Sequence, residues 1–372
     1  MPAVKTFVPK FLPRADLDWR RLVPHLGRAA RALAHYDGIL HGLPDPAVLL
    51  SPLTTQEAVL SSKIEGTQAT LSDVLRFEAG EPARSAERGE DIREIINYRR
   101  ALREAERALK KGRFSLDLLK QLHALLLDSV RGRDRSPGEF RQSRVWIGAP
   151  GMPIEVARFI PPGPARLPKL LANLESYWRG EELDPLVQLA LIHAQFEIIH
   201  PFRDGNGRIG RILVPLFLYE KKLLSRPMFY LSEYLDANRT EYIARLRALN
   251  GLESWNAWTV FFLHALAAQA EANANRARGI LALYERLKAR TIALTRSQYA
   301  VPLLDRLFAQ PIFASNDLFS DPTMPTKPVV TQLLRHLRDA GILKQLREAS
   351  GRRPQVLALA ELVILCEGKK RV

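Results

Sequence analysis

The stretch 200–211 concentrates the residue types that phosphate chemistry needs. It reads His-Pro-Phe-Arg-Asp-Gly-Asn-Gly-Arg-Ile-Gly-Arg. Glycines let a backbone approach a ligand closely, and a glycine loop leading into a helix presents amide donors and the positive end of the helix dipole. Arg208 and Arg211 lie three residues apart, so they share one helix face from which both guanidinium groups can bind phosphate oxygens. The stretch therefore predicts an anion site for nucleotide phosphates.

Two further residues of this stretch can do chemistry. The Asp204 carboxylate is a ligand suited to Mg²⁺, which usually takes one or two carboxylates plus substrate phosphates. His200 stands at the edge of the loop, where an imidazole can take the proton of an incoming hydroxyl. A single Gly-x-Gly is usually a turn and a single histidine is usually structural. Here, however, six constrained positions fall within one short stretch, which favours a nucleotide site.

Two apolar helices are expected to position the stretch. Residues 186–199 are apolar at helical spacing and predict a buried helix. It should end near His200, because Pro201 disfavours the helical conformation in the residue before it. Residues 209–219 predict a second apolar helix, so the chemistry lies in a helix-loop-helix joint.

The stretch resembles the signature of the Fic (filamentation-induced-by-cyclic-AMP) family, His-Pro-Phe-x-Asp/Glu-Gly-Asn-Gly-Arg-x-x-Arg, at every fixed position. The resemblance implies transfer of AMP from ATP to a Ser, Thr or Tyr hydroxyl of a protein, with release of pyrophosphate. It implies that His200 is the general base, that Asp204 is the Mg²⁺ ligand and that the Phe202 side chain points into the core. A branch that resembles the toxin Doc has lysine at the position of Gly207 and transfers phosphate, so Gly207 favours attack at the α-phosphate. The resemblance places ATP on Gly205, Asn206, Gly207, Arg208, Ile209, Gly210 and Arg211.

A second motif precedes this signature. The sequence Thr54-Thr55-Gln56-Glu57 has the form of a capping box, and it predicts a helix over 54–66 that Gly66 caps. Residues 61–66, Ser61-Ser62-Lys63-Ile64-Glu65-Gly66, resemble the Fic inhibitory motif Ser/Thr-x-x-x-Glu-Gly/Asn. The resemblance implies that Glu65 binds Arg211 within the ATP site, where the γ-phosphate would lie. The alternative is a solvated glutamate at a helix end.

Two other parts of the site follow from the resemblance. Residues 145–147 and 157–160 have strand character around a Gly-Ala-Pro-Gly break, and they predict a β-hairpin. In Fic proteins such a hairpin covers the site and aligns the target segment by strand addition; the alternative is a simple packing flap. Asn238 and Tyr242 are expected near the adenine, the alternative being a surface asparagine and a core tyrosine.

The C-terminal segment resembles a winged helix. Helices are expected over 303–308, 314–318 and 326–340, with a two-stranded wing over 343–346 and 355–359. In a winged helix the third helix reads DNA, and Arg352 and Arg353 would lie at the tip of the wing. The alternative is a module for protein contact or dimerisation, because a fold does not fix a function.

The composition limits the possible domain number, disulfide content, binding partners and localisation of the protein. A chain of 372 residues, 47% hydrophobic and 26% charged, is of ordinary globular composition and exceeds one typical domain. Its single cysteine excludes a disulfide framework. The net charge of +15 is compatible with nucleic acid or anionic substrates, but arginine is spread over the whole chain. With no apolar signal segment and no run near the roughly 18 residues that span a bilayer, we expect a soluble, cytoplasmic protein without membrane contact.

The sequence thus predicts a mainly α fold: a Fic helical core with a β-hairpin flap, plus a C-terminal winged helix. The predicted domains are an N-terminal helical region over 1–110, a catalytic core over 111–265, a helical connector over 266–292 and a winged helix over 293–372. The predicted function is a protein adenylyltransferase that uses ATP and Mg²⁺, is autoinhibited by Glu65 and modifies itself as well as a target protein. A homodimer and DNA are further expected partners. The alternatives are an enzyme that removes AMP, with Glu65 positioning a water, and a DNA-binding regulator that senses nucleotide.

Overall fold

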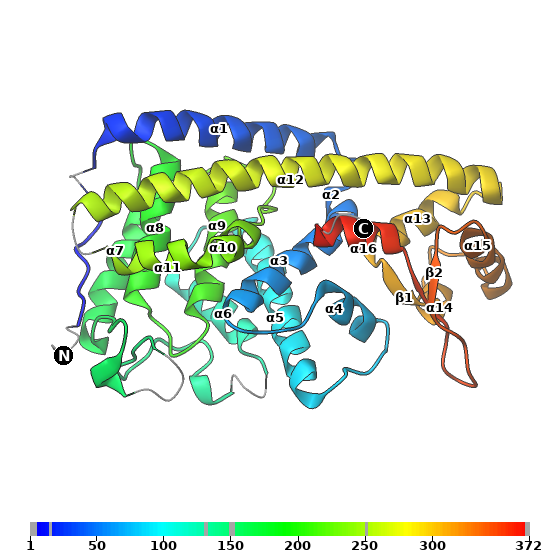
Figure 1. Cartoon of the computed structure of the whole chain (residues 1–372), viewed down its shortest axis with the longest axis horizontal. Coiled ribbons are helices and arrows are strands. Elements are labelled where there is room, and N and C mark those ends of the chain that lie inside the picture. The colour runs from blue at the N-terminus through cyan, green and yellow to red at the C-terminus, as the bar shows by residue number, and fades with distance from the viewer. Residues whose placement is uncertain (1–5, 15–16, 130–132, 149–152, 250–251, 369–372) are drawn as a thin grey trace. The chain divides into compact units, whose positions relative to one another are not determined.

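The computed structural model describes residues 6–14, 17–129, 133–148, 153–249 and 252–368, and its fold is mainly helical with one small sheet (Figure 1). The α-helices up to the signature are α1 (Trp19–Gly42), α2 (Pro46–Leu49), α3 (Ser51–Ile64), α4 (Leu71–Glu78), α5 (Ala86–Leu109), α6 (Leu116–Leu126), α7 (Leu167–Arg179), α8 (Pro185–Ile199) and α9 (Asn206–Glu220). Those that follow are α10 (Ser232–Ala237), α11 (Arg239–Arg247), α12 (Leu252–Thr295), α13 (Ala300–Ala309), α14 (Ser315–Phe319), α15 (Lys327–Asp339) and α16 (Ala360–Glu367). The strands are β1 (Ile312–Ala314), β2 (Lys344–Arg347) and β3 (Val356–Ala358), and short 3₁₀ turns occupy Arg133–Arg135, Ile154–Val156 and Pro164–Arg166.

The chain divides into two compact units that interleave along the sequence. The first comprises 1–37, 60–66 and 97–271, and the second comprises 38–59, 67–96 and 272–372. Several long helices, among them α1 and α12, therefore contribute to both units. The four domain ranges expected from the sequence are continuous segments, so they do not coincide with these units, and they stay a prediction.

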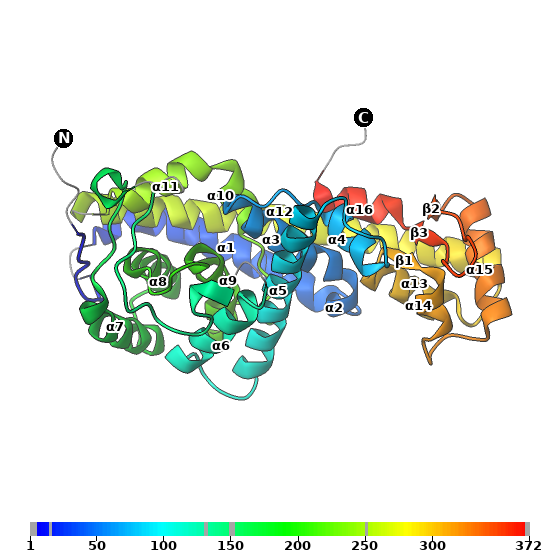
Figure 2. The same cartoon turned by 90° about the horizontal axis from the view of Figure 1, so that it is seen from below.

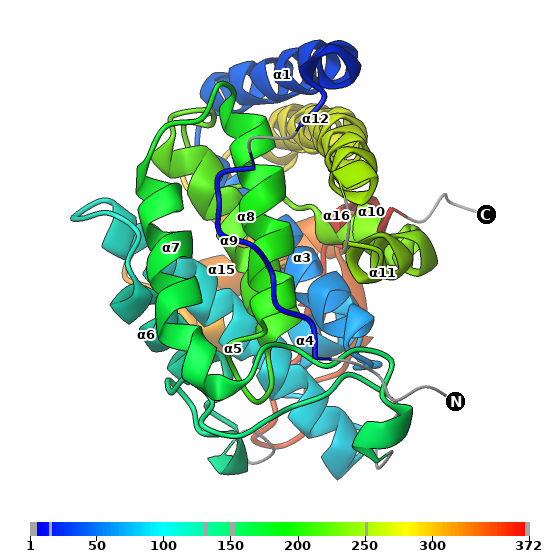
Figure 3. The ribbon, with the colours of Figure 1, turned by 90° about the vertical axis from the view of Figure 1, so that its left-hand side faces the viewer.

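The first unit is built around α8 and α9, the two helices that flank the signature. Helix α8 is apolar on all sides, and nearly all of its residues are buried, as expected for a helix enclosed by others. Helix α9 packs along it, α7 lies beside it, and the Trp258 indole of α12 donates a 2.8 Å hydrogen bond to the Ala190 carbonyl (Figure 3). Outside them, the first parts of α1 and α12 lie side by side and are joined by ion pairs of Arg21 with Glu253 and of Arg28 with Glu271. The signature is thus held by the best-packed part of the unit.

The start of the helix that carries the inhibitory motif differs from the prediction. Helix α3 begins at Ser51, three residues before the predicted cap, and the Thr54 hydroxyl points back to the Leu50 carbonyl instead of capping amides. The predicted capping box was therefore wrong. Pro52 explains the earlier start, because proline fits the first turn of a helix. At the other end α3 stops at Ile64, and Gly66 turns the chain with a φ of +112°.

The predicted β-hairpin is reduced to a single pair of residues. Ile147 and Phe159 form one isolated antiparallel bridge, with N–H···O distances of 2.8 Å from Ile147 to Phe159 and of 3.3 Å in the reverse direction. No longer ladder forms in the described part of this region, and the predicted turn at 149–151 lies outside the described residues. The prolines at 153, 161 and 162 lack a backbone N–H, which limits the ladder that these segments can build.

The second unit contains the small sheet. Its strand order is β1-β3-β2, all antiparallel, with Ala358 of β3 opposite Ile312 on one side and Lys344 on the other. Figure 2 shows these strands beside α13, α14 and α15. In the same unit α2 packs on α13, and α4 packs on β1 and α16. The three helices and two wing strands expected from the sequence lie at the predicted places, whereas β1 was not predicted.

Across the described residues, no helix combines the length and the apolar character that crossing a lipid bilayer would require.

Candidate functional site

The loop that opens the site is held in an unusual backbone conformation. His200 caps the end of α8 with φ and ψ of 50° and 61°, in the left-handed region that non-glycine residues rarely adopt. Gly205 takes a φ of 75° just before α9 begins. The first bond within α9 runs from the Ile209 N–H to the Gly205 carbonyl, so the amides before Ile209 lack acceptors inside the helix. Strain at His200 and amides at a helix start are both features of ligand sites.

Asn206 stabilises the loop from within. Its side-chain oxygen accepts from the Phe202 N–H at 2.9 Å, and its side-chain nitrogen donates to the Phe202 carbonyl at 2.9 Å. Both residues are buried. The Asn206 amide group therefore fixes the loop, and any contribution of this residue to the predicted anion hole must come from its backbone.

His123, from α6, supports the loop from below, a role that the sequence did not reveal. Its ring stacks on Phe202 with centroids 3.7 Å apart and an 8° interplanar angle. The Gly138 N–H donates to Nδ1 at 2.9 Å, so the ring proton is on Nε2, which donates to the Asp204 carbonyl at 3.0 Å. Burial lowers the pKa of His123 to about 4, and this imidazole is therefore neutral at pH 7. It positions the loop without carrying charge into it.

Arg141 ties the end of α8 to the neighbouring loops. Its side chain is 3% exposed and donates to the carbonyls of Ile199 at 3.2 Å and of His200 at 2.7 Å. Further donations reach the carbonyls of Ser143 and Pro162. The last carbonyls of a helix lack intrahelical donors, so this guanidinium satisfies several of them at once. Nothing local in the sequence predicts the contacts with Pro162 and with the end of α8, because they join three separate segments.

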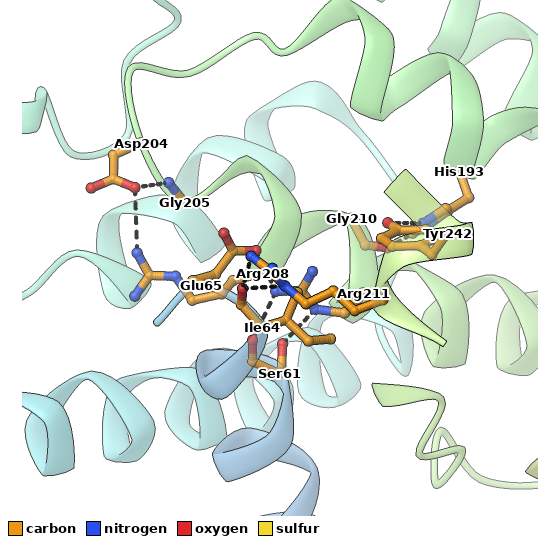
Figure 4. A network of polar contacts seen from close by, with 11 residues as sticks. Ser61, Ile64, Glu65, His193, Asp204, Gly205, Arg208, Gly210, Arg211 and Tyr242 are labelled. Carbon is orange, nitrogen blue, oxygen red and sulfur yellow. Dashed lines mark hydrogen bonds and ion pairs between the residues drawn. The ribbon is translucent and has the colours of Figure 1, made fainter. Parts of the chain in front are cut away.

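The inhibitory motif meets the signature at Arg211 (Figure 4). Oε1 of Glu65 lies 2.7 Å from Arg211 Nη2, and the same guanidinium donates to the Ser61 hydroxyl at 2.8 Å and to the Ser61 carbonyl at 2.9 Å. Burial alone would lower the pKa of Arg211, but the nearby Glu65 carboxylate offsets this and the pKa lies above its usual value. Burial likewise would raise the pKa of Glu65, but Arg211 outweighs it and the pKa is lowered. Both groups are therefore charged at neutral pH.

The approach of Glu65 requires a glycine at position 207. A Cβ added to Gly207 would lie 2.3 Å from Oε1 of Glu65 and 3.0 Å from Nη1 of Arg211. No side chain fits there while the two residues remain in place. Gly207 thus lies directly against the Glu65–Arg211 pair.

Helices α10 and α11 contact the end of α3. Arg239 donates to the Ile64 carbonyl from Nε at 3.2 Å and from Nη2 at 3.0 Å. One residue earlier, Lys63 Nζ lies 2.6 Å from the Asp236 carboxylate. The two donations of Arg239 fix the helix end immediately before Glu65, while the Lys63–Asp236 ion pair at the surface contributes little.

A cavity of about 450 Å³ joins these groups. Of the residues predicted for the site, it is lined by Glu65, His200, Gly207, Arg211 and Tyr242. Its other lining residues are Ile64, Trp146, Ile147, Gly148, Arg158, Phe159, Glu197, Ile198, Arg239, Ile243, Leu246 and Arg247. The remaining predicted residues are not among those that line it: Ser61, Gly66, Asp204, Gly205, Asn206, Arg208, Ile209, Gly210 and Asn238.

Two titratable groups of α8 face this cavity. Burial lowers the pKa of His200 to about 4, and its Nδ1 lies 3.4 Å from the Glu197 carbonyl. Since a carbonyl only accepts, Nδ1 carries the proton and Nε2 keeps its lone pair. Burial raises the pKa of Glu197 to about 7, and its Oε1 is enclosed without a hydrogen-bond partner. Glu197 was not predicted, although its spacing from His193 and His200 places all three on one helix face.

The residues expected near the adenine lie in different settings. Tyr242 is 3% exposed, and its hydroxyl donates to Nε2 of His193 at 2.9 Å, while Nδ1 of His193 donates to the Gly210 carbonyl at 3.1 Å. Tyr242 therefore belongs to the core and also to the cavity wall. Asn238 joins α10 to α11, and its side chain donates to the Tyr234 carbonyl at 2.9 Å.

Asp204 offers a carboxylate at the opening of the loop. The side chain is 48% exposed, and Oδ1 accepts from the Gly205 N–H at 2.6 Å and lies 3.6 Å from Arg208 Nη2 (Figure 4). Among the described residues no group of three or more His, Cys, Asp or Glu side chains is arranged to hold a metal by itself. One exposed carboxylate fits Mg²⁺, which completes its coordination with substrate phosphates and water.

The fold and the loop define a helical domain in which Glu65, just after α3, pairs with Arg211 of α9. Comparison with family models adds the family. Residues 23–107 match the Fic/DOC family N-terminal model, and residues 113–218 match the Fic/DOC family model. The chain therefore carries both the N-terminal and the Fic domains of the Fic/DOC family.

Individual relatives agree with this assignment. A probable protein adenylyltransferase of Aquifex aeolicus is 30% identical over 201 residues, which cover 53% of this chain and 55% of that protein. The protein adenylyltransferase Fic of Drosophila grimshawi is 30% identical over 162 residues, or 42% of this chain and 31% of the fly protein. The chain thus aligns with about half of the first relative's length and about a third of the second's.

Solved structures share the fold. A Fic family protein from Desulfovibrio desulfuricans G20 matches with a TM-score of 0.59 and 21% identity, covering 95% of this chain and 98% of that chain. Fic-1 from C. elegans matches with a TM-score of 0.53 and 20% identity over 71% of this chain and 75% of that chain. The likeness to the bacterial protein therefore extends over nearly all of this chain, the C-terminal part included.

Proposed function

We propose that the protein transfers AMP from ATP to a hydroxyl group of a protein. The observation that carries the proposal is that His200, Gly207, Arg211 and Glu65 line one cavity. The cavity therefore contains a proton acceptor, the start of a helix and a positively charged group that can bind an anion. The names of the relatives, protein adenylyltransferases, support this reaction.

In the reaction His200 acts as the general base. Its imidazole is neutral at pH 7 because burial lowers its pKa to about 4, and Nε2 accepts the proton of the target hydroxyl. The hydroxyl oxygen attacks the α-phosphorus of ATP, an O–P bond forms, and the bond to the departing pyrophosphate breaks. The transferred AMP remains as a phosphodiester on the target.

The start of α9 binds the phosphates in this proposal. The backbone from Asn206 to Arg208 supplies amides, and Arg208 and Arg211 supply the guanidinium groups. Asp204 would hold Mg²⁺, which when bound neutralises part of the negative charge that develops on the phosphate oxygens. Tyr242 and Asn238 would lie near the adenine of the bound ATP.

We further propose that Glu65 keeps the enzyme inactive. Arg211 is one guanidinium with two possible anionic partners, Glu65 and the γ-phosphate. While Glu65 occupies it, the triphosphate cannot take the pose that presents its α-phosphorus to His200. Breaking a buried pair is costly unless a new anion replaces the first, so the arrangement suits a switch.

Incubation with ATP labelled at the α-phosphate tests both proposals. We expect weak labelling of the wild-type protein, strong labelling of Glu65→Gly on itself or on lysate proteins, and none of the Glu65→Gly/His200→Ala double variant. Labelling that is unchanged in Glu65→Gly would argue against inhibition, and no labelling in any variant would refute AMP transfer. Loss of label from a modified target, dependent on Glu65, would instead favour AMP removal.

The C-terminal part of the second unit supports a separate proposal, a winged helix. The order α13, β1, α14, α15, β2, β3 and the antiparallel sheet have that topology, and an isolated bridge between Ser350 and Arg353 closes the β2–β3 connection. Arg352 and Arg353 are exposed at this tip. DNA binding through α15 is tested by a mobility shift with random-sequence duplexes, and a second copy of this chain is the other partner to test by sedimentation.

A further inference from the structure

Three arginines line one side of the cavity. Arg239 and Arg247 come from α11, and Arg158 comes from the segment that bridges to Ile147. All three residues are exposed. They lie outside the start of α9, where the phosphate ligands of the proposed reaction are placed.

These arginines are charged groups without a charged partner. Among the described residues, none of the three forms an ion pair with a carboxylate, whereas Arg245 on the same helix is paired with Glu241 at 2.9 Å. Arg239 donates to the Ile64 carbonyl, which leaves its positive charge uncompensated. The pKa of Arg247 is lowered by burial and by the charges of Arg158 and Arg239, so both of these charges act on the Arg247 guanidinium in the shared cavity wall. Like charges gathered in this way cost free energy unless an anionic partner binds them.

The shape of the surroundings fits a protein segment. Arg239 and Arg247 lie two helical turns apart, which is about 12 Å along the helix axis. An extended peptide rises about 3.3 Å per residue, so this distance corresponds to about four residues. Ile243 and Leu246 provide an apolar floor, and Trp146, 43% exposed, stands at the same cavity. An aromatic side chain of this kind is a typical anchor in protein recognition.

We propose that Arg158, Arg239 and Arg247 form a docking surface for an acidic segment of the target protein, which presents its hydroxyl to His200. This proposal rests on the proposed function, because it names the kind of protein that receives AMP. Carboxylates before and after the modified residue would pair with the arginines, while the triphosphate remains on α9. The arginines thus select the target by charge, and the cavity interior selects the nucleotide.

Binding and transfer are measured separately to test the docking surface. The probes are a fluorescent peptide with one serine between glutamates and the same peptide with glutamine in place of glutamate. Anisotropy should show that the wild-type protein binds the glutamate peptide more tightly and that added salt weakens this binding. In the Glu65→Gly background, the KM for the glutamate peptide should rise about tenfold or more in Arg158→Glu/Arg247→Glu, because two attractive charge pairs become repulsive.

Two controls make the test specific. Arg245→Glu changes an arginine of the same helix that does not line the cavity, and it should leave the peptide KM unchanged. The Arg158→Glu/Arg247→Glu variant should have a lower KM for a peptide with lysines around the serine than for the glutamate peptide. Misfolding cannot produce this gain.

The outcomes separate the two proposals. Peptide labelling without any preference for charge would overturn the docking surface and leave AMP transfer standing. Charge-dependent binding without labelling of any protein would overturn AMP transfer and leave the docking surface standing. A rise in the KM for ATP, with an unchanged peptide KM, would assign the arginines to the nucleotide instead and overturn the docking surface.

Discussion

Glu65 and Arg211 lie 2.7 Å apart across the site, so the guanidinium that we propose as a phosphate ligand already has an anionic partner in this structure. The two side chains differ in exposure: Arg211 is 1% exposed and Glu65 is 41% exposed. The arginine is therefore a fixed part of the core, held by Ser61, while the glutamate can leave toward the cavity. Under the proposed inhibition, activity would therefore depend on the movement of one carboxylate.

Replacing Glu65 should strengthen ATP binding in a graded way. A hydrogen bond to a charged group contributes about 1.5–3 kcal/mol, so Glu65→Gly should raise the affinity for ATP about 10- to 100-fold. Glu65→Gln keeps an oxygen that can accept but loses the charge, and its affinity should fall between the two. Competition with a fluorescent ATP analogue measures this series. Equal affinities in all three proteins would mean that Glu65 does not compete with the nucleotide.

Arg239 should restrain the same glutamate indirectly. Its two donations to the Ile64 carbonyl fix the end of α3, so Arg239→Ala should free Glu65 more often and raise ATP affinity about 3- to 10-fold, the equivalent of one net hydrogen bond. Lys63→Ala is the matched control, because it removes an exposed ion pair to Asp236 that contributes little. If both variants bind ATP as the wild type does, the end of α3 is not held by these contacts.

From the sequence it was possible to predict the parts of the site that form a recognisable motif. The loop from His200 to Arg211 is placed as expected between two buried helices, and the partnership of Glu65 with Arg211 was anticipated from the resemblance of residues 61–66. The loop was predicted correctly because its conformation depends on local spacing, whereas the pair of Glu65 and Arg211 joins positions 146 residues apart and was predicted only from the resemblance.

The parts that were missed depend on contacts between distant segments. Arg141 satisfies carbonyls of two other segments, and His123 reaches a loop more than eighty positions further along the chain. The hydrophobic periodicity of the sequence does not indicate such contacts. The hairpin failed for a different reason: β-branched and aromatic residues favoured strands, but the prolines limit the ladder, and in the described part of this region only Ile147 and Phe159 pair.

His123 should be needed for the loop geometry. His123→Phe keeps the stacking on Phe202 but leaves the Asp204 carbonyl and the Gly138 N–H without partners, which should lower the free energy of unfolding by about 2–4 kcal/mol. Urea unfolding followed by circular dichroism measures this loss. His123→Gln restores a donor and an acceptor and should recover part of both the stability and the labelling activity in the Glu65→Gly background. Full activity in His123→Phe would show that the loop does not depend on this imidazole.

Glu197 should make the protein less stable as the pH rises toward neutrality. Its ordinary pKa of 4.5 is raised to about 7 in the folded protein, chiefly by burial and further by the charge of Glu65, while Arg211 acts in the opposite direction. Between pH 4.5 and about 7 the folded protein keeps a proton that the unfolded chain has lost, so the stability contributed by this group falls through that interval.

Glu197→Gln removes the titration and preserves the shape of the side chain. Its unfolding free energy should match that of the wild type near pH 4.5 and exceed it by about 1–3 kcal/mol at pH 8, since each pKa unit corresponds to about 1.4 kcal/mol. Unfolding in urea at a series of pH values measures the difference. A difference that stays constant with pH would mean that Glu197 ionises as readily in the folded protein as in the unfolded chain. In that case a second permanent negative charge would face Arg211, and the Glu197 carboxylate would compete with Glu65 and the γ-phosphate for this guanidinium.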